Sequence, residues 1–295
     1  MSSCSSCFGG GVRNGPDASA LLQNTLISST LSKIHYKLFI MSGKGGVGKS
    51  SVTVNAAAAL ASKGFAVGIL DVDIHGPSVP RLLNLSGRVE ADERGELLHP
   101  VRYNERLAVI SMDSLLRDRN SAILWRGPKK TAAIRQFISG VNWGALDFLL
   151  IDSPPGTGDE HMTVLKTIPD ALCIVVTTPQ EISLADVRKA VNFLQYAKAN
   201  VLGVVENMSG LHCPHCRQEI ELFKKGGGAL LAEQYGIPFL GGVPLDPATV
   251  AAADQGIPVV FLEGDFPAKQ GFLALADNIA KEAAGSLEAL ASNHN

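Results

Sequence analysis

Short apolar runs alternate along the chain with longer segments whose apolar residues recur at helical spacing. Each short run is bounded by Gly, Pro or polar residues, as is typical of strands buried on both faces of a sheet. The alternation predicts an α/β fold with a mostly parallel, doubly wound sheet and helices on both faces. We expect strands at residues 37–41, 66–70, 146–151, 171–177, 201–205 and 239–243, and helices at 49–62, 129–139, 184–197, 228–235 and 270–284.

The two ends of the chain differ from its middle. Residues 1–34 are rich in Ser, Gly and Asn and contain two cysteines, so we expect a flexible tail in which only 21–31 favours a short helix. The middle, residues 35–284, is predicted to be one domain, and residues 285–295 a C-terminal tail.

Two local features refine this picture. Ser183 and Asp186 have the spacing of a capping box and predict the start of a helix. Residues 96–112 alternate in polarity around a turn at Asn104 and Glu105, which predicts an inserted hairpin.

Charge and composition exclude several classes of protein. The 26 basic residues nearly balance the 28 acidic ones, and without a long basic run we expect no nucleic-acid partner. No apolar stretch reaches the roughly 18 residues that a membrane span needs, so we expect no membrane partner. The N-terminus lacks the basic and apolar regions of a signal peptide, and we expect a cytoplasmic protein.

A glycine-rich loop follows the first predicted strand and opens the first long helix. It matches the pattern G-x-x-x-x-G-K-[ST], and its glycines let backbone N–H groups converge on phosphate oxygens. Lys49 is expected to bind the β and γ phosphates of ATP, and the Ser50 hydroxyl to bind Mg²⁺. The nucleotide-binding residues are predicted to be Gly43, Lys44, Gly45, Gly46, Val47, Gly48, Lys49, Ser50 and Ser51.

Carboxylates follow two further predicted strands. Asp71 and Asp73 come after the strand at 66–70, and Asp152 comes after the strand at 146–151. In a parallel sheet the carboxyl ends of strands meet at one edge, where ligands bind. Asp152 is therefore expected to bind Mg²⁺ through water, and the Pro-Pro-Gly turn after it to contact the γ phosphate.

The loop carries a second lysine, Lys44, directly after its first glycine. This deviant Walker A pattern resembles the group of dimeric ATPases that includes MinD, ParA and nitrogenase iron protein. Within that group the chain is similar to the Mrp/Nbp (ApbC-like) iron–sulfur cluster carriers over about residues 35–280. The segments that carry the resemblance are 41–50, 71–78, 125–128, 151–159, 206–209 and 243–246.

The resemblance implies roles for individual residues. Lys44 would reach across a dimer interface to the partner's ATP, where it would stabilise the transition state of hydrolysis. Asp73 would position the attacking water, while Asp152 would lie in the second switch loop. Asn207 and the region of Pro244 would contact the adenine.

A pair of cysteines, Cys213 and Cys216, has the spacing CxxC. In the family that the chain resembles, this pair binds the iron of a cluster. Since a [4Fe-4S] cluster usually takes four thiolates, two copies of the chain, or this chain and a paralogue, would supply the full set. The implied protein is a carrier that passes a labile cluster to apo iron–sulfur proteins.

Other interpretations of the pair remain open. It could form a thioredoxin-like redox motif, which needs the first Cys at a helix N-terminus. Two pairs could instead bind zinc as a Cys4 site, or the loop could bind no metal. Cys4 and Cys7 form a second CxxC in the N-terminal tail, where related carriers have four cysteines, so their role as ligands stays open. Cys173 lies in an apolar run and is expected to be inert.

Two other functions compete with the carrier. A positioning ATPase of the MinD or ParA kind would need a basic or amphipathic surface, and residues 283–295 contain no Lys or Arg. An ATP-coupled electron-transfer protein would need a cluster that stays bound while it changes redox state.

Overall fold

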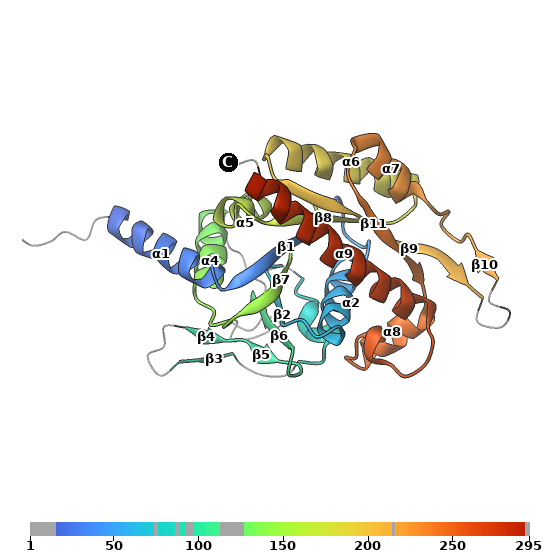
Figure 1. Cartoon of the computed structure of the whole chain (residues 1–295), viewed down its shortest axis with the longest axis horizontal. Helices are drawn as coiled ribbons and strands as arrows, with labels where there is room; N and C mark the ends of the chain where they lie inside the picture. Colours follow the sequence, from blue (N-terminus) through green and yellow to red (C-terminus); the bar gives the residue numbers. More distant parts are fainter. Residues whose placement is uncertain are drawn as a thin grey trace, which may run out of the picture.

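One mostly parallel sheet of nine strands organises the part of the chain that the structure describes (Figure 1). This structure is a computed structural model, and it describes residues 16–73, 76–85, 89–92, 97–112, 127–213, 216 and 218–292. The strands are β1 (Ile34–Ser42), β2 (Val67–Asp71), β3 (Glu90–Ala91), β4 (Leu98–His99), β5 (Val101–Arg102), β6 (Leu107–Ser111), β7 (Leu146–Asp152), β8 (Leu172–Thr177), β9 (Asn200–His212), β10 (Glu219–Ile220) and β11 (Phe239–Leu245). The helices are α1 (Pro16–Leu31), α2 (Lys49–Ser62), α3 (Val79–Leu82), α4 (Gly127–Ser139), α5 (Asp159–Thr167), α6 (Glu181–Tyr196), α7 (Gly227–Tyr235), α8 (Pro247–Asp254), the 3₁₀ turn η2 (Val259–Phe261) and α9 (Pro267–Ser292).

The sheet has the order β10-β9-β8-β1-β7-β2-β6-β5, and β11 pairs with β9 beside this path. The pairings of β1, β2, β6, β7, β8, β9 and β11 are parallel, while β5 and β10 run antiparallel to their neighbours at the two ends of this order. Strands β3 and β4 form a separate antiparallel pair. The predicted α/β class with a mostly parallel sheet is confirmed.

Strand β1 shows why the apolar runs form central strands. Leu38 and Ile40 pack into the core beneath α2 and α9, whereas Phe39 and Met41 pack into the core beneath α4, α5 and α6. All four side chains are buried, because alternate residues of a strand point to opposite faces and helices cover both.

The N-terminal segment differs from the expected flexible tail. Helix α1 begins at Pro16, and its Ile27 and Leu31 are buried in the core on the α4 side of the sheet. Arg135 of α4 donates hydrogen bonds to the side chains of Gln23 and Asn24. Residues 16–31 of the expected tail therefore form a docked helix.

The C-terminal helix also extends further than expected, since α9 continues to Ser292. The described chain contains no helix that combines the length and the apolar character needed to span a membrane.

The predicted capping box is wrong. Helix α6 begins at Glu181, after the extended residue Gln180, and no side chain caps it. The hydroxyl of Ser183 lies in the first turn and is hydrogen-bonded by Thr178 Oγ1 at 2.7 Å.

The predicted hairpin around Asn104 is present, with β5 antiparallel to β6. However, β6 is more than part of an insertion. It pairs in parallel with β2 along its whole length and is completely buried.

Candidate functional site

The phosphate loop connects β1 to α2 at the carboxyl edge of the sheet. Gly48 adopts a φ of +79°, and a Cβ there would lie 2.3 Å from Asn207 Nδ2. At Gly43, a Cβ would lie 2.4 Å from the backbone carbonyl of Asp186. Glycine is therefore required at both positions, by backbone conformation at one and by close packing at the other.

Asp152 lies at the end of β7 and is surrounded by donors from α2. Its Oδ2 accepts hydrogen bonds from Lys49 Nζ at 2.8 Å and from Ser50 Oγ at 2.6 Å. Its Oδ1 accepts one from Thr53 Oγ1 at 2.6 Å. Lys49 and Asp152 are both buried, so this ion pair sits in a low-dielectric environment directly behind the phosphate loop.

A second buried carboxyl, Asp71, lies beside Asp152 on the neighbouring strand. Burial raises the pKa of Asp71 well above its ordinary value of 3.8, and the charge of Asp152 raises it further. Asp71 accepts hydrogen bonds from the Asp73 backbone N–H at 3.0 Å and from Ser111 Oγ at 2.9 Å. Burial beside Asp152 therefore favours the protonated form of the Asp71 carboxyl.

Asp71→Asn is expected to make stability less sensitive to rising pH. Because the pKa of Asp71 is raised on folding, its stabilising contribution is complete below about pH 3.8 and is lost as pH rises through the folded-state value. While the folded carboxyl keeps a proton that the unfolded chain has released, stability falls by about 1.4 kcal/mol per pH unit. Asparagine does not titrate, so the variant lacks this pH-dependent loss of stability. Its amide can still accept a hydrogen bond from the Asp73 backbone N–H and donate one to Ser111.

Urea unfolding of both proteins from about pH 4 upward measures this difference. The exposed Asp254 provides the matched control, and Asp254→Asn should leave the pH profile unchanged. If the free energy of unfolding changed with pH in the same way for Asp71→Asn and the wild type, the raised pKa of Asp71 would be contradicted.

A cavity of about 270 Å³ opens in front of the phosphate loop. Besides the loop and Ser51, it is lined by Asp73 and by Pro155 of the turn after Asp152. Asp73 is buried, and its Oδ1 accepts the Gly76 backbone N–H at 3.1 Å. Lys44 also lines this cavity and is partly exposed. The structure thus brings together the loop, both of its lysines and the predicted water-positioning carboxylate.

Asn207 and Pro244 lie on adjacent strands but have different surroundings. Asn207 is on β9, and its Nδ2 donates to the Val47 carbonyl of the phosphate loop at 2.9 Å. Pro244, on β11, lines a second and larger cavity of about 830 Å³. Asn207 is not among the residues lining that cavity, so its side chain is bonded to the loop and does not face the space beside Pro244.

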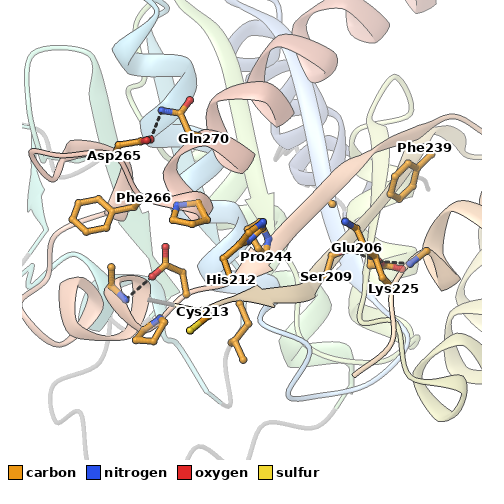
Figure 2. Close-up of a pocket in the computed structure, with 17 residues that line it drawn as sticks. Glu206, Ser209, His212, Cys213, Lys225, Phe239, Pro244, Asp265, Phe266 and Gln270 are labelled. Carbon is orange, nitrogen blue, oxygen red and sulfur yellow. Dashed lines mark hydrogen bonds between the residues drawn. The ribbon is translucent and has the colours of Figure 1, made fainter. Parts of the chain in front are cut away.

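The larger cavity extends along β11, from Phe239 to Leu245, and along the second half of β9 (Figure 2). Asp265, Phe266 and Gln270 lie along one side of it, and Glu206 and Lys225 along the other. Its wall is more apolar than polar, which suits a flat aromatic base with a few orienting polar groups.

The cysteine pair lies in the connection between the antiparallel strands β9 and β10, which form a β-hairpin. Strand β9 runs to His212, and β10 returns antiparallel to it, with Cys213 N–H donating to the Gln218 carbonyl at 2.9 Å. Cys213 is half-buried and lines the larger cavity, whereas Cys216 is exposed. Because Cys213 follows a strand, the described residues do not provide the helix N-terminus that a thioredoxin-like motif uses.

Some expected ligands lie outside the described residues. These are Cys4 and Cys7. Cys173 lies buried in β8, where burial raises the pKa of its thiol to about 12, as expected for an unreactive core residue.

Sequence reasoning missed two residues that organise the site. Thr53 contacts Asp152, and it lies four positions after Lys49, on the same face of α2. Glu206 is buried, and its carboxylate accepts the backbone N–H groups of Gly226 and Gly228, at 2.9 and 2.6 Å, and the Ser209 hydroxyl at 2.6 Å. Glu206 thereby joins β9 to the start of α7, a contact that no local pattern reveals.

The residues at the phosphate loop fit a magnesium nucleotide. Ser50 Oγ and Asp152 Oδ2 lie 2.6 Å apart beside the loop, and Mg²⁺ prefers oxygen ligands of these types. Lys49 and the backbone N–H groups at the start of α2 suit the negative charge of the phosphates.

Comparison with known proteins agrees with this geometry. Residues 33–280 match the family described as the ParA-type NUBPL iron-transfer P-loop NTPase. An iron-sulfur cluster carrier protein of Methanocaldococcus jannaschii is 44% identical, over 92% of this chain and 94% of its own length. The cytosolic Fe-S cluster assembly factor CFD1 of Saccharomyces cerevisiae is 49% identical, over 78% of this chain and 80% of its own length.

Solved structures support the same conclusion. A nucleotide-binding protein of Archaeoglobus fulgidus in complex with ADP superposes with a TM-score of 0.70 at 39% identity, covering 80% of this chain and 92% of that one. The cell division ATPase MinD of Pyrococcus furiosus has a TM-score of 0.62 at 22% identity, covering 83% and 98%, and it confirms the predicted MinD type of fold. With a family match over most of its length and relatives above 40% identity, this chain belongs to the NUBPL iron-transfer P-loop NTPases.

Proposed function

We propose that this protein is an ATP-hydrolysing carrier of iron–sulfur clusters. It would hold a labile [4Fe-4S] cluster as cargo between Cys213 and Cys216 of two subunits and pass it to apo iron–sulfur proteins. The observation that carries the proposal is strand β9, on which Asn207 contacts the phosphate loop while the following hairpin presents two thiols.

The proposed binding of the phosphates and Mg²⁺ follows from charge and geometry. Lys49 binds the β and γ phosphates, while Ser50 and Asp152 hold Mg²⁺, Asp152 through water. The bound Mg²⁺ neutralises charge that develops on the phosphate oxygens. Asp73 lines the phosphate cavity and orients the attacking water, and Lys44 of the partner subunit adds positive charge at the γ phosphate.

The adenine base of the nucleotide binds in the larger cavity. The adenine lies against Pro244, and Asn207 changes partner from the Val47 carbonyl to the base when nucleotide binds. The neighbouring apolar surface, including Phe266, excludes water from the ring.

Binding of the cluster requires a second subunit. One hairpin supplies two thiolates and a [4Fe-4S] cluster usually takes four, so a homodimer or a heterodimer with a paralogue completes the set. We include Cys4 and Cys7 in the same proposal as further ligands. We also include zinc, in place of iron, as the metal in protein isolated in air. We further propose that the carrier works in the cytoplasm, as the name of the yeast relative says of that protein.

Anaerobic reconstitution with iron and sulfide tests the whole proposal. We expect about four iron atoms per dimer, ATP turnover that depends on Mg²⁺, and loss of the cluster to an apo-acceptor within the time of mixing. A cluster that stays bound to this protein while it is reduced and reoxidised would instead indicate electron transfer. A protein that stayed monomeric with both ATP and iron supplied would contradict the proposal.

A further inference from the structure

A buried histidine, His161, lies near the backbone of Pro154, in the turn that follows Asp152. It belongs to the first turn of α5, and only 1% of its surface is exposed. Its ring packs edge-on against Phe39 of β1, with ring centres 5.8 Å apart, and against Phe193 of α6, with centres 6.2 Å apart. The aromatic neighbours therefore fix the plane of the imidazole.

Neither ring nitrogen of His161 has a hydrogen-bond partner among the residues that the structure describes. Burial lowers the pKa of the ring to about 4, so the imidazole is neutral, with one N–H donor and one acceptor. An unsatisfied buried donor costs stability, and an apolar ring would fill the same space without that cost. The imidazole therefore calls for an explanation other than packing.

The nearest explanation is the backbone of Pro154, which lies close enough to His161 to raise the pKa of its ring. Since proline has no N–H, the group concerned is its carbonyl. That carbonyl accepts the Ser153 hydroxyl at 2.9 Å and has a second lone pair for another donor.

The histidine and the turn are held by different parts of the fold. Next to His161, Glu160 forms an ion pair of 2.8 Å with Lys130 of α4, which fixes the start of α5. The turn itself is held at Gly156, whose N–H donates to the Ser42 carbonyl at 3.1 Å, and Pro155 lines the phosphate cavity. A nucleotide that presses on Pro155 can thus move the Pro154 carbonyl relative to a stationary ring.

We propose that His161 is a positioning residue for residues 153–158, and that its ring N–H donates to the Pro154 carbonyl when this turn closes on the γ phosphate. The inference rests on the ATP hydrolysis proposed above. The ring lies near the Pro154 carbonyl in this structure without a well-formed hydrogen bond to it. The full bond forms in the closed state, so the imidazole favours closure.

Two substitutions separate this role from packing. His161→Phe keeps an aromatic ring between Phe39 and Phe193 but removes the donor, whereas His161→Gln keeps a donor near the position of Nε2. We expect His161→Phe to lower kcat about tenfold or more, with KM within about twofold and with thermal stability equal to or above that of the wild type. His161→Gln should recover most of the lost kcat. Thr167→Val, at another buried polar position of α5, should leave kcat unchanged.

Hydrogen exchange gives a readout that does not need hydrolysis. With Mg²⁺ and a non-hydrolysable ATP analogue, we expect the amides of residues 157 and 158 to become protected in the wild type and in His161→Gln, but not in His161→Phe. Equal protection in all three proteins would overturn the inference, as would a loss of kcat that only follows a loss of stability. A wild type that binds the analogue but hydrolyses no ATP would refute the proposed activity, while the exchange data would still decide the role of His161.

Discussion

Lys49→Ala is expected to weaken ATP binding by at least about a hundredfold. Lys49 contacts two phosphates in the proposed complex, and a hydrogen bond to a charged group contributes about 1.5–3 kcal/mol. Losing both contacts weakens binding by about 10²- to 10⁴-fold. The substitution also leaves Asp152 buried without its cation and lowers the free energy of unfolding by up to about 3–5 kcal/mol, an effect that the hydroxyls of Ser50 and Thr53 partly offset.

Titration with a fluorescent ATP analogue, at a temperature where unfolding curves show the variant folded, measures the loss. Lys37→Ala is the matched control, because Lys37 is also a buried lysine and pairs with Asp170 at 2.8 Å, but does not line the phosphate cavity. Its affinity for ATP should equal that of the wild type. An affinity of Lys49→Ala within about threefold of the wild type would show that the phosphates bind elsewhere.

Replacing either thiol of the hairpin, by Cys213→Ser or Cys216→Ser, is expected to remove the reconstituted cluster while ATP still binds. A serine hydroxyl stays protonated at neutral pH and is a poor ligand for iron, and each substitution removes two of the four thiolates of a dimer. The fold should hold, because Cys216 is exposed and Cys213 is only half-buried. The loss is measured as the sulfur-to-iron charge-transfer absorbance together with iron and sulfide content.

Cys173→Ala is the control for a cysteine that plays no part in binding. Cys173 is buried in β8, and this variant should keep its full iron content. A complete cluster in Cys213→Ser would place the ligands elsewhere, with Cys4 and Cys7 as the next candidates. Zinc as the metal that survives anaerobic purification and chelator treatment would instead favour a structural Cys4 site.

Local sequence patterns predicted where the phosphate loop and its neighbouring carboxylates lie on the sheet. Helix α2 begins at Lys49 as expected, because the glycines before it end β1 and leave the backbone N–H groups free for an anion. Asp152 and Asp73 lie near the loop, since parallel strands present their carboxyl ends at one edge. These features depend on residues that are close in sequence or on one topological rule.

What the sequence did not predict depends on distant contacts. Strand β6 was read as half of a hairpin, because only its pairing with β2 makes it part of the central sheet. Helix α1 has a weak pattern of its own and is held by Arg135, more than a hundred positions away. Such contacts form only after the chain has folded.

Strand β9 sets a thermodynamic constraint on the carrier. It bonds to the phosphate loop through Asn207 and continues, paired with β11 as far as Leu211, to the hairpin that holds the thiols. Any factor by which ATP changes the retention of iron must reappear as the factor by which iron changes the affinity for ATP. At a given ATP concentration, protein with iron and protein without iron should then differ in the fraction that has ATP bound. That fraction would indicate how much of the carrier holds iron.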